Sequence, residues 1–336
     1  MTDEGPSYPK FVRDLFGWYS ITMLALGART GLLDAVLSGG GSVEEISRRA
    51  GTDSRNTLEW LRALTAAGHV VADDGRFSLA EETRAVLGPR FPTDARGVLS
   101  FVDGISKMTT DVAAAMVSGR GIEPALYDNA FEPAVGRLNT PMFSAALVDD
   151  WIGGLDGTAD TLREGGGVAD IACGNGDAVR LIARAFPRAH VVGFDIVVPR
   201  EQDLPDNAEL RIADATQLPG DAAYDLVTCL DAFHHLGDPV KVASRAREAL
   251  RPGGALMVVE PSMTGDLAVD AQEPFSVIVY ASTLLWCLQE NLAAGGTGDT
   301  GGDGSAWAVD ALSRGGFENV TVRSSETGYD VITGVA

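Results

Sequence analysis

The sequence has few of the residues that build disulfides, basic surfaces or metal clusters. Its 336 residues include 3 cysteines, 4 histidines, and 26 lysines and arginines against 47 aspartates and glutamates, for a formal net charge of −21. Binding to nucleic acid or to anionic lipid draws mainly on Lys and Arg, so we expect neither partner. Cys173, Cys229 and Cys287 are far apart in apolar runs, which predicts reduced, buried thiols.

Long apolar runs are also absent. The longest, "FSVIVYASTLLWCL" at 275–288, is shorter than the ~20 residues that cross a bilayer. The first ten residues, "MTDEGPSYPK", are acidic and polar, whereas a signal peptide is basic and then apolar. We therefore expect a cytoplasmic protein that does not bind membranes.

The chain has ample material for folded domains. Hydrophobic residues make up 45% of it, and 40 glycines indicate many tight turns. At this length, one large domain and a smaller one are expected. We predict a winged-helix or dimerisation domain over 1–100, a helical connector over 101–155 that roofs a pocket, and a Rossmann-like domain over 156–336.

The pattern over the first hundred residues is typical of a winged helix. Helical spacing over 11–37 is followed by a helix from Ser42 with Glu45 in a capping box, and then by a helix over 52–68. A hairpin over 69–79 completes the order. The helix over 52–68 would enter a DNA groove, but its only basic residues are Arg55 and Arg62. A dimerisation or lid role therefore fits better than DNA recognition.

The connector is rich in methionine and aromatic side chains. Such residues at helical spacing usually form core, but as a group they could roof a substrate pocket. They are Phe101, Met108, Met116, Tyr127, Phe131, Met142, Phe143 and Trp151.

From Gly167 onward, short apolar runs alternate with helical segments. This alternation predicts a doubly wound, mostly parallel α/β sheet with an antiparallel last strand. Strands are expected at 167–172, 190–196, 209–215, 225–231, 255–261, 319–324 and 329–335, and helices at 177–186, 238–250 and 307–316. Ligands of such sheets bind outside the carboxyl ends of the strands. The acids at those ends are Asp170, Asp195, Asp214, Asp231 and Glu260.

The stretch "DIACGNGD", 170–177, links the first of these strands to a helix. Gly174 and Gly176 let the backbone come close to a ligand, and the helix N-terminus offers free amide donors. Asp195 could accept the hydroxyls of a ribose, and Asp214 an amino group on a purine. Three acids at three successive strand ends are hard to explain as packing.

Residues 160–336 resemble a class I S-adenosylmethionine-dependent methyltransferase. The matching segments are "VADIACGNGDAVRLIARAFP", "VVGFDI", "IADATQLPGDAAYDLVTCLDAFHHLGDP" and "EALRPGGALMVVEP", in the family order. With the winged helix, the whole chain is similar to small-molecule methyltransferases of bacterial secondary metabolism and to plant O-methyltransferases, which dimerise through their first domain. The resemblance implies S-adenosylmethionine as cofactor, a natural-product acceptor and a homodimer.

Site residues also follow from this resemblance. Asp170, Gly174 and Gly176 would face the methionine part of the cofactor. Asp195 would bind the ribose, and Asp214 with Ala215 would bind the adenine. His234 stands where the plant enzymes keep their general base, and His235 is its neighbour and competitor.

The residues themselves support a histidine base. Two of the four histidines are adjacent in "LDAFHHLGDP", just past a strand end. An imidazole there can take a proton from a phenol, hydroxyl or amine, although a hydrogen-bonded or helix-capping pair is an equal alternative. Asp231 and Glu260 could orient the imidazole or the substrate. No metal site is predicted, because Asp299 and Asp303 lack His or Glu at ligand spacing.

The sequence departs from the family pattern at two places. Ala172 stands where glycine is usual. After Asp195, "VVPREQDLPDNAEL" leaves room only for a stub such as "PREQDL" in place of the helix that normally flanks the adenosine.

The short connection opens a second hypothesis. A methyltransferase-fold enzyme that no longer transfers methyl groups could catalyse an S-adenosylmethionine-independent intramolecular displacement, such as aziridine formation in antibiotic biosynthesis. A third hypothesis is a regulatory protein whose winged helix binds a small partner subunit. The glycine-rich stretch Ala293–Trp307 is expected to be either a mobile lid or a plain flexible loop.

Overall fold

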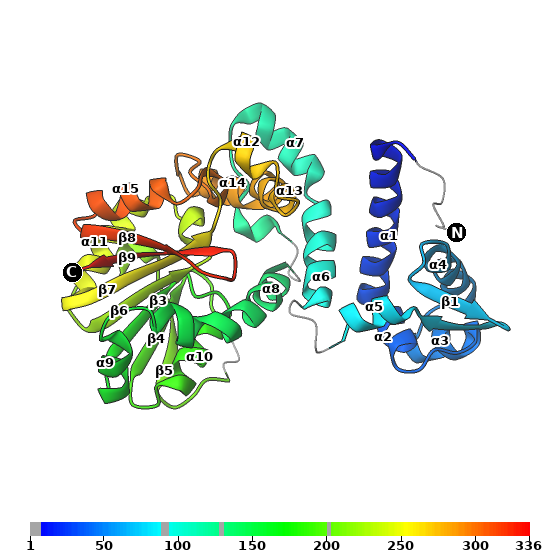
Figure 1. The fold of residues 1–336 in the computed structure, drawn as a ribbon, viewed down its shortest axis with the longest axis horizontal. Helices are drawn as coiled ribbons and strands as arrows, with labels where there is room; N and C mark the ends of the chain where they lie inside the picture. Colours follow the sequence, from blue (N-terminus) through cyan, green and yellow to red (C-terminus); the bar gives the residue numbers. More distant parts are fainter. Residues whose placement is uncertain (1–7, 89–93, 128–130, 200–202) are drawn as a thin grey trace. The chain divides into compact units, whose positions relative to one another are not determined.

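A computed structural model describes residues 8–88, 94–127, 131–199 and 203–336. The chain forms two compact units, Met1–Ser106 and Lys107–Ala336 (Figure 1). Within the described ranges, no helix has both the length and the apolar character needed to cross a membrane.

The first unit has the predicted winged-helix order. Ser42 and Glu45 form the expected capping box, and Gly51 ends that helix at a left-handed φ of 68°. Asp74 and Gly75 turn the hairpin with positive φ angles. The elements are α1 (Lys10–Thr30), α2 (Leu32–Leu37), α3 (Val43–Ala50), α4 (Ser54–Ala66), β1 (Val70–Asp73), β2 (Arg76–Leu79), α5 (Glu81–Val86) and α6 (Ala95–Ser106).

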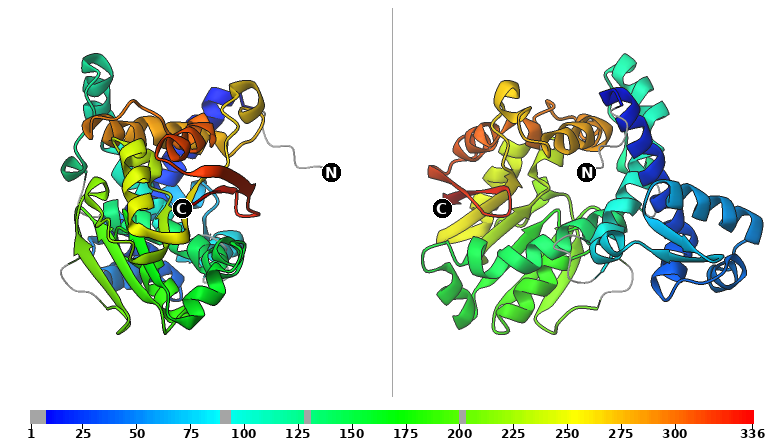
Figure 2. Two further views of the ribbon diagram at one scale, coloured as in Figure 1. Left: turned by 90° about the vertical axis from the view of Figure 1, so that its left-hand side faces the viewer. Right: turned by 45° about the vertical axis from the view of Figure 1, so that its right-hand side comes forward.

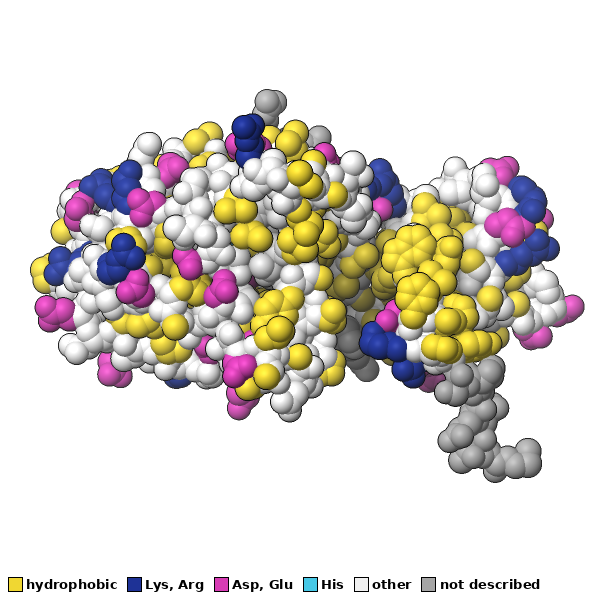
Figure 3. Space-filling view, turned by 90° about the horizontal axis from the view of Figure 1, so that it is seen from above, with side chains coloured by type: hydrophobic (Ala, Val, Ile, Leu, Met, Phe, Trp, Pro, Cys, Tyr) yellow, Lys and Arg dark blue, Asp and Glu magenta, His cyan; other side chains and the backbone are white. Residues whose placement is uncertain are grey.

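Two features of this unit bear on its partners. Arg55 and Arg62, the basic residues of α4, both pair with Glu59. Several large apolar side chains of α1 are exposed, among them Phe11, Trp18 and Tyr19. In the space-filling view, hydrophobic side chains gather on the surface of the first unit (Figure 3).

The second unit is built on a seven-stranded sheet in the order β5-β4-β3-β6-β7-β9-β8. Its strands are β3 (Gly167–Ile171), β4 (His190–Asp195), β5 (Ala208–Ile212), β6 (Tyr224–Leu230), β7 (Leu250–Pro261), β8 (Glu318–Ser324) and β9 (Tyr329–Val335). Five neighbouring strands, β5, β4, β3, β6 and β7, run parallel to one another. Strand β9 is antiparallel to both of its neighbours, β7 and β8. The predicted fold class is confirmed.

Helices cover both faces of the sheet (Figure 2). They are α9 (Thr158–Glu164), α10 (Asp177–Ala185), α11 (Pro239–Ala249) and α15 (Ala306–Arg314), with short 3-10 turns η3 (Ala215–Gln217) and η4 (Phe233–His235). Near the carboxyl ends of the strands lie α7 (Thr109–Ser118), η1 (Pro124–Leu126), α8 (Phe131–Ala146), the π-helix η2 (Leu147–Ile152), α12 (Leu267–Asp270), α13 (Ser276–Ser282), the π-helix η5 (Thr283–Cys287), α14 (Leu288–Ala293) and η6 (Gly301–Asp303).

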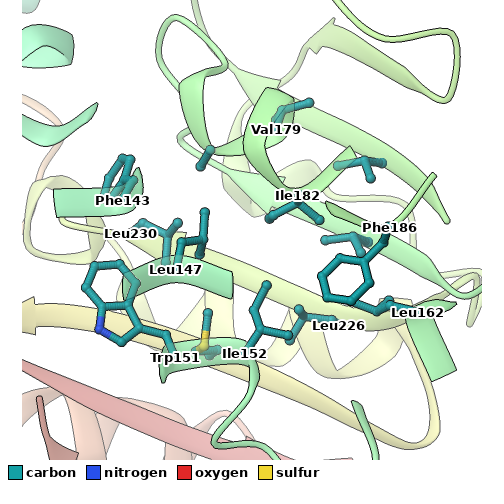
Figure 4. Close-up of a cluster of buried hydrophobic side chains, with 14 of the residues drawn as sticks. Phe143, Leu147, Trp151, Ile152, Leu162, Val179, Ile182, Phe186, Leu226 and Leu230 are labelled. Carbon is teal, nitrogen blue, oxygen red and sulfur yellow. The ribbon is translucent and has the colours of Figure 1, made fainter. Parts of the chain in front are cut away.

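One core lies where α8 and η2 meet α10 and the sheet. Phe143, Leu147 and Trp151 pack there with Ile182 and Phe186 (Figure 4). Phe143 and Trp151, which the sequence offered as pocket roof, are therefore core residues. Met116 is 65% exposed.

The connection between β4 and β5 is as short as the sequence predicted. Its described residues, 196–199 and 203–207, contain no helix, and part of the predicted stub "PREQDL" lies outside the described residues.

The glycine-rich stretch Ala293–Trp307 is partly packed. Gly301, Gly302 and Thr300 are buried, and Trp307 stacks on Phe233 with ring centroids 5.6 Å apart. The second half of the stretch is therefore packed, while Ala294, Gly295 and Thr297 in its first half are exposed.

Candidate functional site

The glycine turn between β3 and α10 is held in an unusual backbone conformation. Ala172, Gly174 and Gly176 have φ angles of 55°, 51° and 76°. A Cβ at Gly174 would have no atom within 4 Å, so open space adjoins the backbone there. The backbone of the turn therefore adjoins open space at the place where the sequence predicts a ligand.

Asp170 is buried at the end of β3. Its Oδ1 accepts a hydrogen bond of 2.6 Å from the hydroxyl of Thr228 on β6. Burial raises the pKa of Asp170 to about 7; the Thr228 bond acts in the opposite direction, and the charge of Asp195 raises the pKa further. The carboxyl can thus be neutral or charged near neutral pH, so a bound cation would favour its ionised form.

Asp195, the last residue of β4, is bonded to the glycine turn. Its Oδ2 accepts from the Gly174 amide at 2.8 Å and its Oδ1 from the Val197 amide at 3.0 Å. Burial raises its pKa, and these backbone bonds lower it. The next side chains, Ile196 and Val197, are 58% and 72% exposed. A carboxylate thus lies beside uncovered apolar surface, a combination that suits a ribose joined to a flat base.

Asp214 has a local role that the sequence did not predict. Its Oδ1 caps η3 by accepting from the Thr216 amide at 2.7 Å and the Thr216 hydroxyl at 2.6 Å. Ala215 packs against a hydrophobic core. The amide of Ala213 donates to the carbonyl of Asp195 at 2.9 Å, so this segment lies directly beside Asp195.

Helix α8 lies against the glycine turn. The hydroxyl of Thr140 donates to Oδ2 of Asp177 at 2.9 Å. A Cβ at Gly136 would come within 2.9 Å of the side-chain nitrogen Nδ2 of Asn175. An open hollow of about 490 Å³ lies at this contact. It is lined by Pro133, Gly136, Arg137, Thr140, Asn175, Asp177, Arg180 and Asp203.

His234 lies in η4 after β6, almost completely buried. Its Nδ1 is 2.5 Å from Oε2 of Glu260, and its backbone amide donates to Oε1 of the same carboxylate at 3.1 Å. Burial lowers the pKa of the imidazole, but Glu260 and Cys287 outweigh it, so the pKa lies well above its usual range. Glu260 therefore fixes the ring and favours Nδ1 protonation, which leaves Nε2 for other partners.

His235 stands against a second carboxylate. Its Nδ1 is 2.7 Å from Oε2 of Glu290, and its ring lies 4.4 Å from that of His234 and 4.5 Å from that of Trp286. Burial and the charge of His234 lower its pKa, while Cys287 and Glu290 raise it, with a net value of about 9. The two adjacent imidazoles thus each have their own acid.

Asp231 joins this group from the end of β6. It has a φ of 52°, and its Oδ2 accepts from Asn139 of α8 at 3.0 Å. Burial raises its pKa to about 6, His234 lowers it and Glu260 raises it. Asp231, His234 and Glu260 each place a ligand-type atom within 4.8 Å of the others. The structure thus brings all four predicted catalytic residues to one place.

Sequence reasoning missed several neighbours of this group. Cys287 was predicted only as a buried thiol, yet it lies beside both imidazoles; burial raises its pKa, but His235 and His234 lower it to about 7. Asn291 donates to the carbonyls of His234 and Leu236 at 3.0 and 3.2 Å. One available signal was the polar "QEN" that ends the apolar run after Cys287.

Comparison with known proteins assigns both parts of the chain. Residues 169–256 match the family model of a methyltransferase domain, and residues 20–88 match that of an Rv2258c-like winged HTH domain. The 27-O-demethylrifamycin SV methyltransferase of Amycolatopsis mediterranei is 34% identical over 125 residues, which cover 33% of this chain and 45% of that protein. The chain spans about half the length of the curated relatives it matches.

Solved structures share the fold over nearly the whole chain. An O-methyltransferase family protein from Burkholderia thailandensis has a TM-score of 0.68 at 16% identity, covering 98% of both chains. Human N-acetylserotonin methyltransferase, solved with S-adenosylmethionine, has a TM-score of 0.67 at 18% identity, covering 98% of this chain and 99% of that one. At such identities the likeness concerns the fold alone.

Proposed function

Because the chain belongs to the class I S-adenosylmethionine-dependent methyltransferases and carries a winged HTH domain, we propose that it methylates a small natural-product acceptor. The observation that supports this proposal is that two groups of residues lie next to each other at the strand ends. One is the open glycine turn bonded to Asp195. The other is the buried His234 held by Glu260. Together they offer a cofactor site and a proton acceptor.

The residues present fit the cofactor. Gly174 leaves open space at the turn, and Asp170 offers a buried carboxyl for the methionine ammonium. Asp195 uses one lone pair of each oxygen on a backbone amide, so a second remains on each for ribose hydroxyls. The exposed apolar side chains of Ile196 and Val197 suit an adenine face.

S-adenosylmethionine supplies a methyl group already activated on its sulfonium. The protein's task is then to hold an acceptor in line and to exclude water, which can lower the barrier by ~7 to 11 kcal/mol. In this proposal the neutral form of His234, which its raised pKa confines to alkaline pH, takes the acceptor's proton at Nε2. Glu260 holds Nδ1–H and stabilises the imidazolium that forms. Asn139 keeps Asp231 beside that position.

Calorimetry with S-adenosylmethionine and S-adenosylhomocysteine tests the cofactor site. We expect micromolar binding that Asp195→Ala abolishes, because the substitution removes both the ribose acceptor and a bond to the turn. Asp206→Ala is the matched control, since Asp206 is an exposed acid in the same β4–β5 connection. Folded wild-type protein that binds neither ligand would overturn the proposal.

The proton acceptor is tested by S-adenosylhomocysteine release against hydroxylated small molecules. Once an acceptor is found, His234→Ala is expected to lower kcat by roughly 10²- to 10⁴-fold while the Kd for the cofactor stays within about twofold. An equal loss in His235→Ala with none in His234→Ala would assign the base to His235.

The short β4–β5 connection favours one alternative. With no helix among its described residues to flank an adenosine, the same crevice could align an internal displacement without a cofactor. Absence of cofactor binding by folded protein, together with cyclisation of a substrate bearing an amine and a leaving group, would select this activity.

A further inference from the structure

Two imidazoles and a thiol, 52 residues apart in the chain, come together in the second unit. His234 and His235 lie in η4, and Cys287 ends the π-helix η5. One ring nitrogen of each histidine and the cysteine sulfur lie within 4.8 Å of one another, and all three side chains are largely buried. We propose that these three residues bind a thiophilic divalent cation, for which zinc is the best match.

The donor set matches zinc chemistry. Zinc is bound by imidazole nitrogen and thiolate sulfur, and sites with three protein ligands leave a fourth position open. From bond lengths of ~2.0 Å to nitrogen and ~2.3 Å to sulfur, tetrahedral ligand atoms lie roughly 3.3 to 3.7 Å apart. The ligand atoms therefore need to move closer by at most about 1.5 Å, which rotation of side chains can supply.

The surroundings of the imidazoles also fit. A metal-binding histidine usually directs its other ring nitrogen to a carboxylate, which fixes the ring and raises its basicity. Here Nδ1 of His234 lies 2.5 Å from Glu260, and Nδ1 of His235 lies 2.7 Å from Glu290. This leaves Nε2 of each ring as the ligand atom. The His234 contact has hydrogen-bond geometry, whereas the His235 contact is an ion pair without it.

Unsatisfied polar atoms are a separate observation. Within the described residues, the contact between Nδ1 of His235 and Oε2 of Glu290 lacks hydrogen-bond geometry, and Nε2 of His235 and Oε1 of Glu290 have no hydrogen-bond partner. Buried polar atoms without partners cost ~1 to 3 kcal/mol each. A cation on Nε2 would satisfy one nitrogen and strengthen the attraction between His235 and Glu290.

A second group of possible metal ligands is a poorer candidate for the cation site. Asp231, His234 and Glu260 also lie within 4.8 Å of one another. Binding a cation there would take Nδ1 of His234 away from Glu260 and compete with the bond from Asn139 to Asp231. The group that contains Cys287 leaves both of these bonds in place.

Metal binding would have one consequence for catalysis, and this consequence alone rests on the proposed function. Nε2 of His234 is the atom that takes the acceptor's proton there. Its lone pair cannot bind a cation and a proton at once. Zinc and methyl transfer are therefore mutually exclusive at this atom, while cofactor binding at the glycine turn is left unchanged.

Cobalt(II) is the probe, because a thiolate ligand gives it a near-ultraviolet charge-transfer band and tetrahedral coordination gives it visible bands. The untagged full chain is stripped of metal with a chelator and titrated with cobalt(II), then with zinc(II). We expect both bands to saturate at one equivalent and zinc to bleach them. Absence of the charge-transfer band in the folded wild-type chain would overturn the proposal.

Variants identify the ligands. Cys287→Ser is expected to lose the charge-transfer band, and His235→Ala to weaken cobalt(II) binding at least about tenfold. Cys173→Ser is the matched control and should keep the band, since Cys173 lies in the glycine turn. Circular dichroism verifies that each variant is folded. A band that survives in Cys287→Ser would contradict the proposal. None of these measurements needs a methyl acceptor, so their failure differs from a failure of methyl transfer.

Discussion

At the scale of single residues, the buried acid Asp170 should make the proposed cofactor binding depend on pH. Its pKa is about 7 in the free protein, and a cation binds best to the ionised form. We expect the Kd for S-adenosylmethionine to fall about 15-fold as the pH rises from 5.5 to 7, to fall about a further twofold by pH 8, and then to level off. Isothermal titration at a series of pH values measures this.

Asp170→Asn is the control for that prediction. It keeps an oxygen for the Thr228 hydroxyl but cannot ionise, so cofactor binding should be weak and lose this pH dependence. Because burial raises the folded pKa above the unfolded one, ionising Asp170 destabilises the fold above about pH 7, and this penalty vanishes near pH 4. The variant should therefore be more stable by ~1 to 4 kcal/mol at pH 8 and unchanged at pH 4. Wild-type binding that is flat across this range would contradict the assignment.

Ala172 is a second residue of interest, because its backbone conformation lowers the stability of the fold by a measurable amount. It holds a φ of 55°, a conformation that costs an L-residue ~1 to 2 kcal/mol and glycine much less. After the entropy that glycine adds to the unfolded chain, Ala172→Gly should stabilise the protein by roughly 0.5 to 1 kcal/mol in chemical denaturation. Ala114→Gly, at an exposed position inside α7, should instead destabilise it by about 1 kcal/mol. A loss of stability in both variants would count against strain at Ala172.

At the scale of elements, Asn291 of α14 joins two segments. One is the histidine turn, which is η4 with His234 and His235, and the other is the glycine-rich stretch Ala293–Trp307. Besides its two bonds to η4 and the residue after it, its Oδ1 accepts from the Gly298 amide at 2.9 Å. Asn291→Ala leaves these buried groups without partners and should cost ~2 to 3 kcal/mol of stability. Hydrogen exchange should become faster at Gly298 and around His234.

Gln289 supplies the matched comparison. It is equally buried, but its side chain donates to the Leu284 carbonyl at 2.8 Å within the same helical segment. Gln289→Ala should therefore lower stability without speeding exchange in the histidine turn. If both variants speed exchange there equally, Asn291 has no special role in holding the turn.

At the scale of the whole molecule, we propose a homodimer formed through α1. Phe11, Trp18 and Tyr19 are 77%, 55% and 57% exposed, and a second copy of the chain would cover such apolar area. Light scattering should give the mass of a dimer, and Phe11→Glu/Trp18→Glu should give a monomer. Val117→Glu, at an exposed apolar residue of α7, should stay dimeric. A wild-type monomer would rule out this dimer.

The sequence alone determined most of the elements and the conformation of the glycine turn. Strand and helix periodicity, the Ser42–Glu45 capping box and the glycines near Gly174 are local signals, each contained in a few consecutive residues. The acids at strand ends followed as well, because parallel strands place their carboxyl ends on one edge of the sheet. Asp214 is the partial exception, since its capping of η3 depends on a neighbouring threonine.

Only the tertiary structure decided what surrounds His234. Glu260, at a strand end, was a candidate from the sequence, but Asn139 comes from α8 and Cys287 from a π-helical turn, and no spacing in the sequence encodes their meeting with it. Such contacts depend on the strand order and on how α8 and η5 pack over the strand ends. For the same reason, the partly packed state of Ala293–Trp307 could not be read from its glycine content. The candidate site residues could be predicted from local sequence signals, whereas the side chains that contact them depend on long-range packing.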